Sequence, residues 1–166
     1  MLHNGITACI DRLTFAADAE AHYCLAYGLD QSGQSKAAVT EYQTAKSMSP
    51  AGVELYYDFG SLLLKVHRCS EAAAEFEKAL KLCPDDLRVV FATATAYTCG
   101  GQLGKAFTMY GVAWDADPSN PKMYEKLGLL YGSLGDRQME TQLMDIAHTL
   151  GKAASLNANL KPKTHN

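Results

Sequence analysis

The chain has 166 residues, of which 48% are hydrophobic and 20% charged, an ordinary globular composition with enough material for one domain. Its net charge of -3, without a basic run, disfavours a nucleic-acid partner. No apolar stretch approaches the roughly 20 residues that a membrane-spanning helix needs. The first residues have neither a basic leader nor a sustained apolar run, so they are not typical of a signal peptide.

Five cysteines are scattered along the chain without a C-x-x-C pair. They are Cys9, Cys24, Cys69, Cys83 and Cys99. An odd number of scattered thiols is typical of a reducing compartment, and the sequence therefore predicts free cysteines and a cytoplasmic location. Because no set of histidines and cysteines has the spacing of metal ligands, we expect neither a metal nor a cofactor.

The first predicted element is an amphipathic helix in residues 1–18. Its apolar positions include Ile6, Ile10 and Leu13, which share one helix face. Three roles remain open for this helix. It could cap the domain that follows, occupy a binding groove, or join two copies of the chain as a homodimer.

From residue 19 onward the sequence repeats with a period of 34 residues, which is typical of a helix–turn–helix solenoid. Pro50, Pro84 and Pro118 are separated by this interval, and each is expected to end the second helix of a block. The period predicts four blocks and a short helix or disordered tail. Their ranges are 19–52, 53–86, 87–120, 121–152 and, for the tail, 153–166.

Three further columns of the repeat have distinct physical roles. The turn column supplies a positive φ between the two helices of a block, and it consists of Gly33, His67, Gly101 and Gly135. Small residues such as Gly60 and Ala72 allow the two helices to approach closely. Large residues such as Tyr42 and Phe76 are expected to fill the space to the following block. Asp86 and Asn120 are expected to cap the helices that follow them.

These columns resemble the tetratricopeptide repeat family. The matching residues are Tyr124, Leu127, Gly128 and Tyr131 in the fourth block, and Ala72, Phe76, Ala79 and Pro84 in the second. The resemblance covers about 19–152 and implies an all-α, right-handed α-solenoid of about four repeats that serves as a protein-binding scaffold. Glu140 stands where the family has a small residue, which suggests that the last helix faces water as a terminal cap.

The histidines and cysteines do not form a recognisable catalytic arrangement. His22 occupies a packing position, and we expect it to be a core or semi-buried histidine. His67 and Cys69 share a turn that lacks an orienting carboxylate and an oxyanion hole, so nucleophilic catalysis there is unsupported. The sequence predicts a protein that is not an enzyme.

Function in such a stack usually lies on the concave groove made by the first helix of each block. The predicted binding residues are Tyr23, Tyr27, Asp30, Tyr57, Leu64, Lys65, Arg88, Phe91, Thr95 and Lys122. Their four aromatic rings would form a track of anchors. We expect an extended or helical partner segment with apolar anchors and with its acidic side near Arg88 and Lys122. The alternative is that some of these rings pack on a neighbouring block.

Several roles fit such a groove. The first is an adaptor, scaffold or chaperone that holds a protein or peptide segment. The layout is also similar to type III secretion translocator chaperones. The alternative is a structural subunit of a larger assembly, such as a secretion or pilus-biogenesis complex. Some relatives in the repeat family clamp the acidic C-terminus of heat-shock chaperones, but only Arg88 matches that clamp, and we do not expect that ligand.

Overall fold

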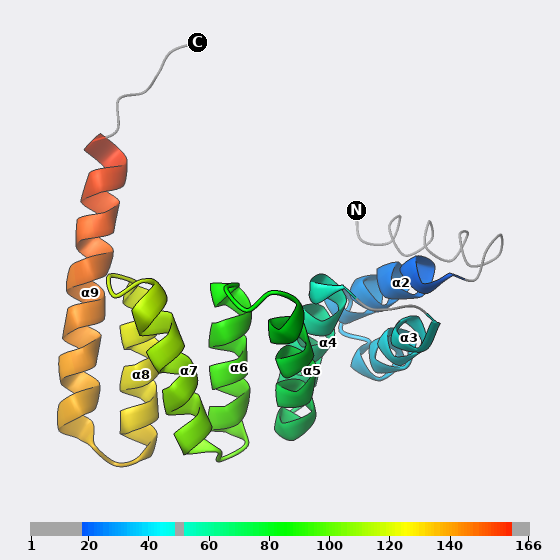
Figure 1. Cartoon of the computed structure of the whole chain (residues 1–166), viewed down its shortest axis with the longest axis horizontal. Coiled ribbons are helices and arrows are strands. Elements are labelled where there is room, and N and C mark those ends of the chain that lie inside the picture. Colours follow the sequence, from blue (N-terminus) through cyan, green and yellow to red (C-terminus); the bar gives the residue numbers. More distant parts are fainter. Residues whose placement is uncertain (1–17, 49–51, 161–166) are drawn as a thin grey trace, which may run out of the picture.

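The computed structural model describes residues 18–48 and 52–160, which form eight α-helices without a strand (Figure 1). The helices are α2 (Ala19–Gln31), α3 (Ser35–Met48), α4 (Val53–Lys65), α5 (Cys69–Leu82), α6 (Leu87–Cys99), α7 (Leu103–Ala116), α8 (Pro121–Ser133) and α9 (Arg137–Leu160). The predicted all-α solenoid is confirmed. The predicted N-terminal helix, Pro50 and the end of the tail lie outside the described residues. Among the helices described, none combines the length and the apolarity needed to cross a bilayer.

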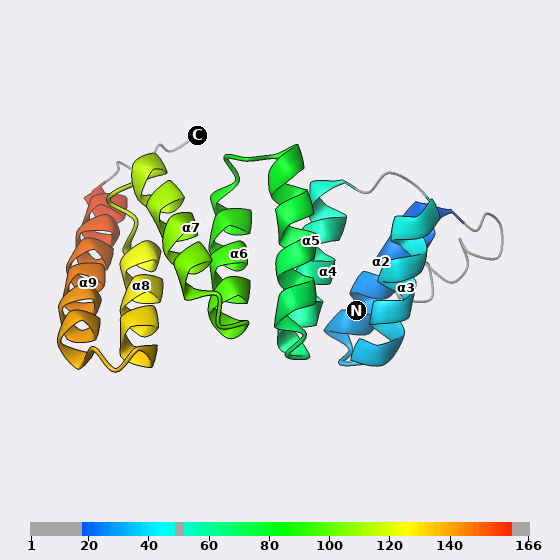
Figure 2. The same cartoon turned by 60° about the horizontal axis from the view of Figure 1, so that its bottom comes forward.

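The helices are arranged as four pairs that stack in a row (Figures 1 and 2). The pairs are α2 with α3, α4 with α5, α6 with α7, and α8 with α9. The first helix of each pair also contacts the first helix of the next, whereas within the described ranges no such contact joins consecutive second helices. Since the first helices are the more closely spaced row, they lie on the inner side of the curved stack. We call the surface of α2, α4, α6 and α8 the inner face.

The turn inside each pair has the same backbone conformation. The φ values are +81° at Gly33, +59° at His67, +71° at Gly101 and +86° at Gly135. The amide after each of these residues donates to a carbonyl five residues earlier, as from Arg68 to Leu63 at 2.8 Å, which is the pattern of a Schellman motif. The turn column is therefore confirmed, and His67 adopts the left-handed conformation that glycine takes in the other three pairs.

The small and large columns pack as the repeat predicts. A Cβ atom added at Gly60 would lie 2.7 Å from the ring of Phe76, so α4 and α5 touch at a distance that only glycine permits there. Ala72 is fully buried in the same pair. Tyr42 stacks on Phe59 of the next pair, with ring centroids 5.4 Å apart. These contacts make one continuous core along the stack.

The helix ends follow the predicted signals. Asp86 accepts the amide proton of Arg88 at 2.9 Å, and Asn120 accepts that of Lys122 at 3.1 Å, so both residues are N-caps. α5 and α7 end two residues before Pro84 and before Pro118 respectively.

The last helix differs from the sequence expectation in two ways. α9 has 24 residues and runs without a break past 152, the predicted end of the repeats, so that it extends well beyond the end of α8 (Figure 1). The helix itself faces water as expected, with Leu143 the only buried residue among 137–155, but Glu140 is half-buried against α8. Its carboxylate packs over Gly132, where an added Cβ would lie 2.5 Å from it, and it pairs with Arg137 at 2.6 Å.

The expectation of free, scattered thiols is also wrong for part of the chain. Cys69 and Cys99 form a disulfide with Cα atoms 5.7 Å apart, and Cys24 is disulfide-bonded as well. The first bond joins the start of α5 to the end of α6, and therefore the second pair to the third. Cys83 is free. Because the argument for a reducing compartment rested on free thiols, these bonds remove its basis.

Candidate functional site

The ten predicted binding residues all lie on first helices. Tyr23, Tyr27 and Asp30 belong to α2; Tyr57, Leu64 and Lys65 to α4; Arg88, Phe91 and Thr95 to α6; and Lys122 to α8. The fold thus distributes them over the four helices of the inner face. Their role in binding stays a prediction, and their surroundings differ from one helix to the next.

Two ion pairs join neighbouring first helices. Lys65 Nζ donates to both carboxylate oxygens of Asp30, at 3.0 and 2.8 Å. Arg88 Nη2 donates to Glu54 at 2.8 Å and to Asp86, also at 2.8 Å. In each pair that crosses between helices, the partners are one repeat apart. Both cations are therefore already occupied by carboxylates, and an acidic partner near Arg88 would have to share or open these contacts.

A third contact between helices has no cation. The Tyr23 hydroxyl donates to Asp58 Oδ2 at 2.6 Å. Burial raises the pKa of Asp58 above its ordinary value, and the charges of Glu54 and Asp30 act in the same direction, while the Tyr23 hydrogen bond acts against them. Burial, and next the bond to Asp58, also raise the pKa of Tyr23. In this contact a partly desolvated carboxylate therefore accepts a hydrogen bond from a phenol.

The four aromatic residues of the predicted track are buried to very different extents. Tyr27 is 48% exposed and Phe91 only 4%. Tyr57 is half-buried, with its ring 5.9 Å from that of Phe76 and 5.2 Å from the Arg88 guanidinium. Tyr27 is thus the open ring of the set, while Phe91 contributes mainly to the core.

The remaining predicted residues differ in how open they are, and Lys122 is the exposed one among them. Lys122 Nζ lies 5.7 Å from the centre of the Phe91 ring and covers it. The Thr95 hydroxyl donates to the Phe91 carbonyl at 2.8 Å, within its own helix, and Leu64 is half-buried. On α8, Leu129 is 47% exposed. The inner face therefore offers Tyr27 and Leu129 as open apolar groups near its two ends.

Two residues beside the predicted site were missed as functional candidates. Tyr42 is fully buried, and its hydroxyl has no hydrogen-bond partner. Its pKa is raised by burial and then by the charges of Asp58 and Asp30. A signal for Asp58 was available in the sequence. It follows Tyr23 by 35 residues, the same offset that separates Lys65 from Asp30.

The histidine and cysteine candidates have structural surroundings. His22 Nδ1 lies 2.7 Å from Glu41 Oε2, and its side chain is 17% exposed, which confirms the semi-buried histidine. Cys69 is bound to Cys99 and is not available as a nucleophile in that state. Within the part of the chain that the structure describes, no cluster of three metal-ligating side chains occurs.

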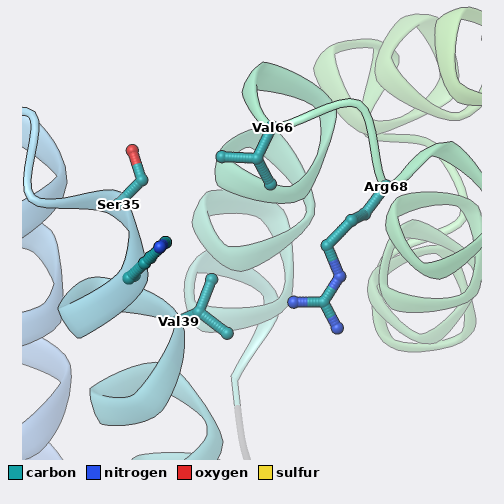
Figure 3. A pocket seen from close by; sticks show the side chains of 5 residues that line it. Ser35, Val39, Val66 and Arg68 are labelled. Atoms are coloured by element: carbon teal, nitrogen blue, oxygen red, sulfur yellow. The ribbon is translucent and has the colours of Figure 1, made fainter.

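A pocket of about 300 Å³ lies away from the predicted site residues. Figure 3 shows its lining, which comes from α3 and the α4–α5 turn and consists of Ser35, Lys36, Val39, Val66 and Arg68. Val39 and Val66 provide apolar walls from the two sides. Arg68 is held by Glu71 in an ion pair of 2.6 Å. The pocket is a feature of the helix turns, and it includes none of the ten predicted residues.

Residues 53–86, which form the predicted second block, match the model of the tetratricopeptide repeat family. The chain therefore carries a tetratricopeptide repeat, and the resemblance is confirmed. Proteins of this kind are protein-interaction modules. Comparison with curated protein sequences gave no match.

Solved structures of tetratricopeptide-repeat proteins have the same fold. MamA from Desulfovibrio magneticus RS-1 superposes with a TM-score of 0.83 at 22% identity, covering 92% of this chain and 86% of that one. YrrB, described as having an unusual peptide-binding site, gives 0.78 at 19% identity, over 93% and 83%. Another MamA structure gives 0.79 at 18% identity, over 90% and 88%. At such identities the similarity establishes the fold.

Proposed function

We propose that this protein is a non-enzymatic binding module that holds an extended or helical segment of a partner protein on its inner face, as an adaptor, scaffold or chaperone. The observation that carries the proposal is the open Tyr27 ring, 48% exposed, on a face where successive repeats present charged groups in register. Exposed aromatic rings are effective anchors because they bury a large area while few rotors are frozen. The peptide-binding site of YrrB supports the choice of a peptide-like ligand.

Capture of partners from a lysate of the source cells tests the proposal. The Tyr27→Ala variant is compared with Trp114→Ala, whose ring on α7 is 46% exposed and lies outside the inner face. We expect Tyr27→Ala to lose one dominant partner that wild type and Trp114→Ala retain. Equal capture by all three would contradict a binding site on the inner face. Tyr57 is less suitable as a first target, because its ring packs on Phe76.

A structural subunit of a larger assembly is favoured by a different observation. Large apolar side chains are exposed on the second helices, namely Met48, Leu82, Val112, Trp114 and Ile146. A subunit of this kind would respond to folded partners. A peptide-binding module should instead be soluble alone and should melt at a higher temperature when a short peptide of its partner is added.

The expected cytoplasmic location becomes part of the proposal only under one condition. Cys69 and Cys99 would have to be reduced in the cell, since disulfides rarely persist in the cytosol. Alkylation of the protein in its source cells, before lysis, reports the state of this pair. Both thiols labelled would support a cytoplasmic location, and both protected would contradict it.

Homodimer formation through the N-terminal helix also stays a proposal. Light scattering of the full chain and of a variant that begins at Asp18 tests it. A dimer that becomes a folded monomer on truncation would support the role of the helix, whereas an unchanged mass would contradict it.

A further inference from the structure

The Tyr23–Asp58 contact contains a carboxylate without a cation. Asp58 is half-buried, and its bonding partner is the Tyr23 hydroxyl at 2.6 Å. Lys65 and Arg88, the cations on the same helix and on the next first helix, are each paired with other carboxylates. Among the described residues, Asp58 therefore has no ion-pair partner, and the negative charges of Glu54 and Asp30 act on it more strongly than the positive charge of Arg88 does. Such a carboxylate attracts a cation from outside.

A buried polar group next to Tyr23 also lacks a partner. Tyr42 is fully buried, and its hydroxyl makes no hydrogen bond. The carboxylates that act most strongly on this hydroxyl are Asp58 and Asp30, and its ring centroid lies 6.1 Å from that of Tyr23. Buried hydroxyls are nearly always satisfied, and leaving one unpaired lowers stability.

Tyr27 provides an aromatic wall next to these groups. It follows Tyr23 by one helical turn on α2, and it is the more exposed of the two. A cation over the face of a tyrosine is attracted by the negative face of the ring. An unpaired carboxylate beside an open ring is therefore suited to a lysine or arginine side chain.

The charges along the inner face determine at which end a cation is favoured. One column of the repeat, with members 34 residues apart, consists of Glu20, Glu54, Arg88 and Lys122. All four side chains are exposed. The column is acidic on α2 and α4, around Asp58, and basic on α6 and α8. Complementary charge orients a ligand and rejects the reversed orientation.

We propose that Tyr23, Tyr27 and Asp58, with the buried Tyr42 ring packed against Tyr23, form a subsite that receives a lysine or arginine side chain of the partner segment. The inference rests on the proposed function and adds the chemistry and direction of the ligand. The ammonium or guanidinium group pairs with Asp58, and its alkyl stem lies along Tyr27. We name this set the Asp58 subsite.

Nuclear magnetic resonance titration of the full chain with N-acetyl-arginine amide tests the subsite directly. We expect saturable amide shifts on α2 and α4 around Tyr27 and Asp58, and little change with the uncharged analogue N-acetyl-citrulline amide. Asp58→Asn should weaken binding by about tenfold or more, since a charge-assisted contact is lost. Asp85→Asn, which removes an exposed carboxylate outside the subsite, should leave the titration unchanged.

Three results would overturn the assignment: no saturable shift with the arginine amide, equal shifts with the citrulline amide, or undiminished binding by a folded Asp58→Asn variant. Asp58→Glu guards against a folding defect, because it restores the charge and should restore part of the binding. Arg12 belongs to the helix predicted for residues 1–18. Binding that appears only in an Arg12→Gln variant would also overturn the partner assignment, since the chain's own arginine would then fill the subsite. The titration needs no partner protein, so its outcome is independent of the capture experiment. A failed titration with successful capture would reject the subsite alone, and a successful titration with failed capture would reject the proposed function alone.

Discussion

Equivalent positions of the repeat have different chemical surroundings at the two ends of the inner face. Tyr23, Tyr57 and Phe91 occupy equivalent positions on α2, α4 and α6, each 34 residues after the last. The Tyr23 hydroxyl bonds the carboxylate of Asp58, whereas the other two rings are covered by the cations of the following pair. The repeat therefore fixes where a ring lies, and the charged side chain that the following pair places beside the ring decides what the ring can bind.

This difference gives the inner face a direction. Its α2–α4 end has an open tyrosine and a carboxylate without a cation, and its α6–α8 end has Lys122 lying over a buried ring. A partner segment that satisfied both ends would place a basic side chain near Asp58 and an acidic one near Lys122. The order of charges in the partner, rather than their number, is then the expected basis of specificity.

The largest expected effect separates the buried ring from the open one. Phe91→Ala should lower the free energy of unfolding by about 3–5 kcal/mol, because it removes a buried aromatic ring. Tyr27→Ala should change it by about 0.5 kcal/mol or less, as is usual for exposed positions. Urea unfolding followed by circular dichroism measures both. Similar losses in the free energy of unfolding for the two substitutions would contradict the difference in burial between Phe91 and Tyr27.

The next effect concerns the disulfide that joins the second helix pair to the third. The Cys69→Ser/Cys99→Ser variant should lose about 3–4 kcal/mol relative to oxidised wild type, because the disulfide closes a chain segment of 30 residues. Cys83→Ser, at the free thiol, is the matched control and should lose less. Thermal unfolding without reductant provides the comparison, and equal melting temperatures for the double variant and wild type would contradict a stabilising bond.

A smaller effect compares equivalent glycines of the α4–α5 and α8–α9 pairs, which lie 68 residues apart in the repeat. Gly60→Ala should cost about 1–3 kcal/mol, since its new Cβ would lie 2.7 Å from the Phe76 ring. Gly128→Ala, where the closest atom is 3.3 Å away, should cost less. Denaturant midpoints measured under the same conditions rank the two. The opposite ranking would mean that α8 and α9 form the tighter pair.

The smallest effect is a pH dependence at Asp58. The pKa of Asp58 is raised from its ordinary value of 3.8, mainly by burial, so the folded state binds its proton more tightly than the unfolded state does. Its favourable contribution is present below pH 3.8 and is lost as the pH rises through the raised pKa. Asp58→Asn should therefore gain stability relative to wild type as the pH increases across this interval. Melting temperatures of both proteins against pH show the trend, and a relative loss with rising pH would reverse the sign.

The sequence predicts the scaffold better than the site. The turn conformation at His67 and the contact between Gly60 and Phe76 follow from a period of 34, because each repeat makes the same local contacts. The cation over the Phe91 ring does not, since Lys122 comes from the next pair. Cys69 and Cys99 are 30 residues apart, and a repeat of 34 residues does not predict that they pair.

The Asp58 subsite shows the same limit. Tyr42 is recognised from the sequence as a packing residue, and its unsatisfied hydroxyl becomes visible only when α2, α3 and α4 are placed together. Asp58 stands out once Lys65 and Arg88 are seen to be paired with other carboxylates. A column of the repeat predicts where a residue lies along its helix. Whether a charged side chain has an ion-pair partner depends instead on several helices at once.

Site-specific photo-crosslinking in the source cells tests the central claim most directly. A photoreactive phenylalanine analogue replaces Tyr27 on the inner face in one variant and Trp114 on α7 in another, and mass spectrometry identifies the crosslinked peptide. The account predicts one partner segment attached at position 27 and absent at 114, with a lysine or arginine near the point of attachment. Adducts that form at 114 and not at 27 would contradict it and would place the interaction on the second helices.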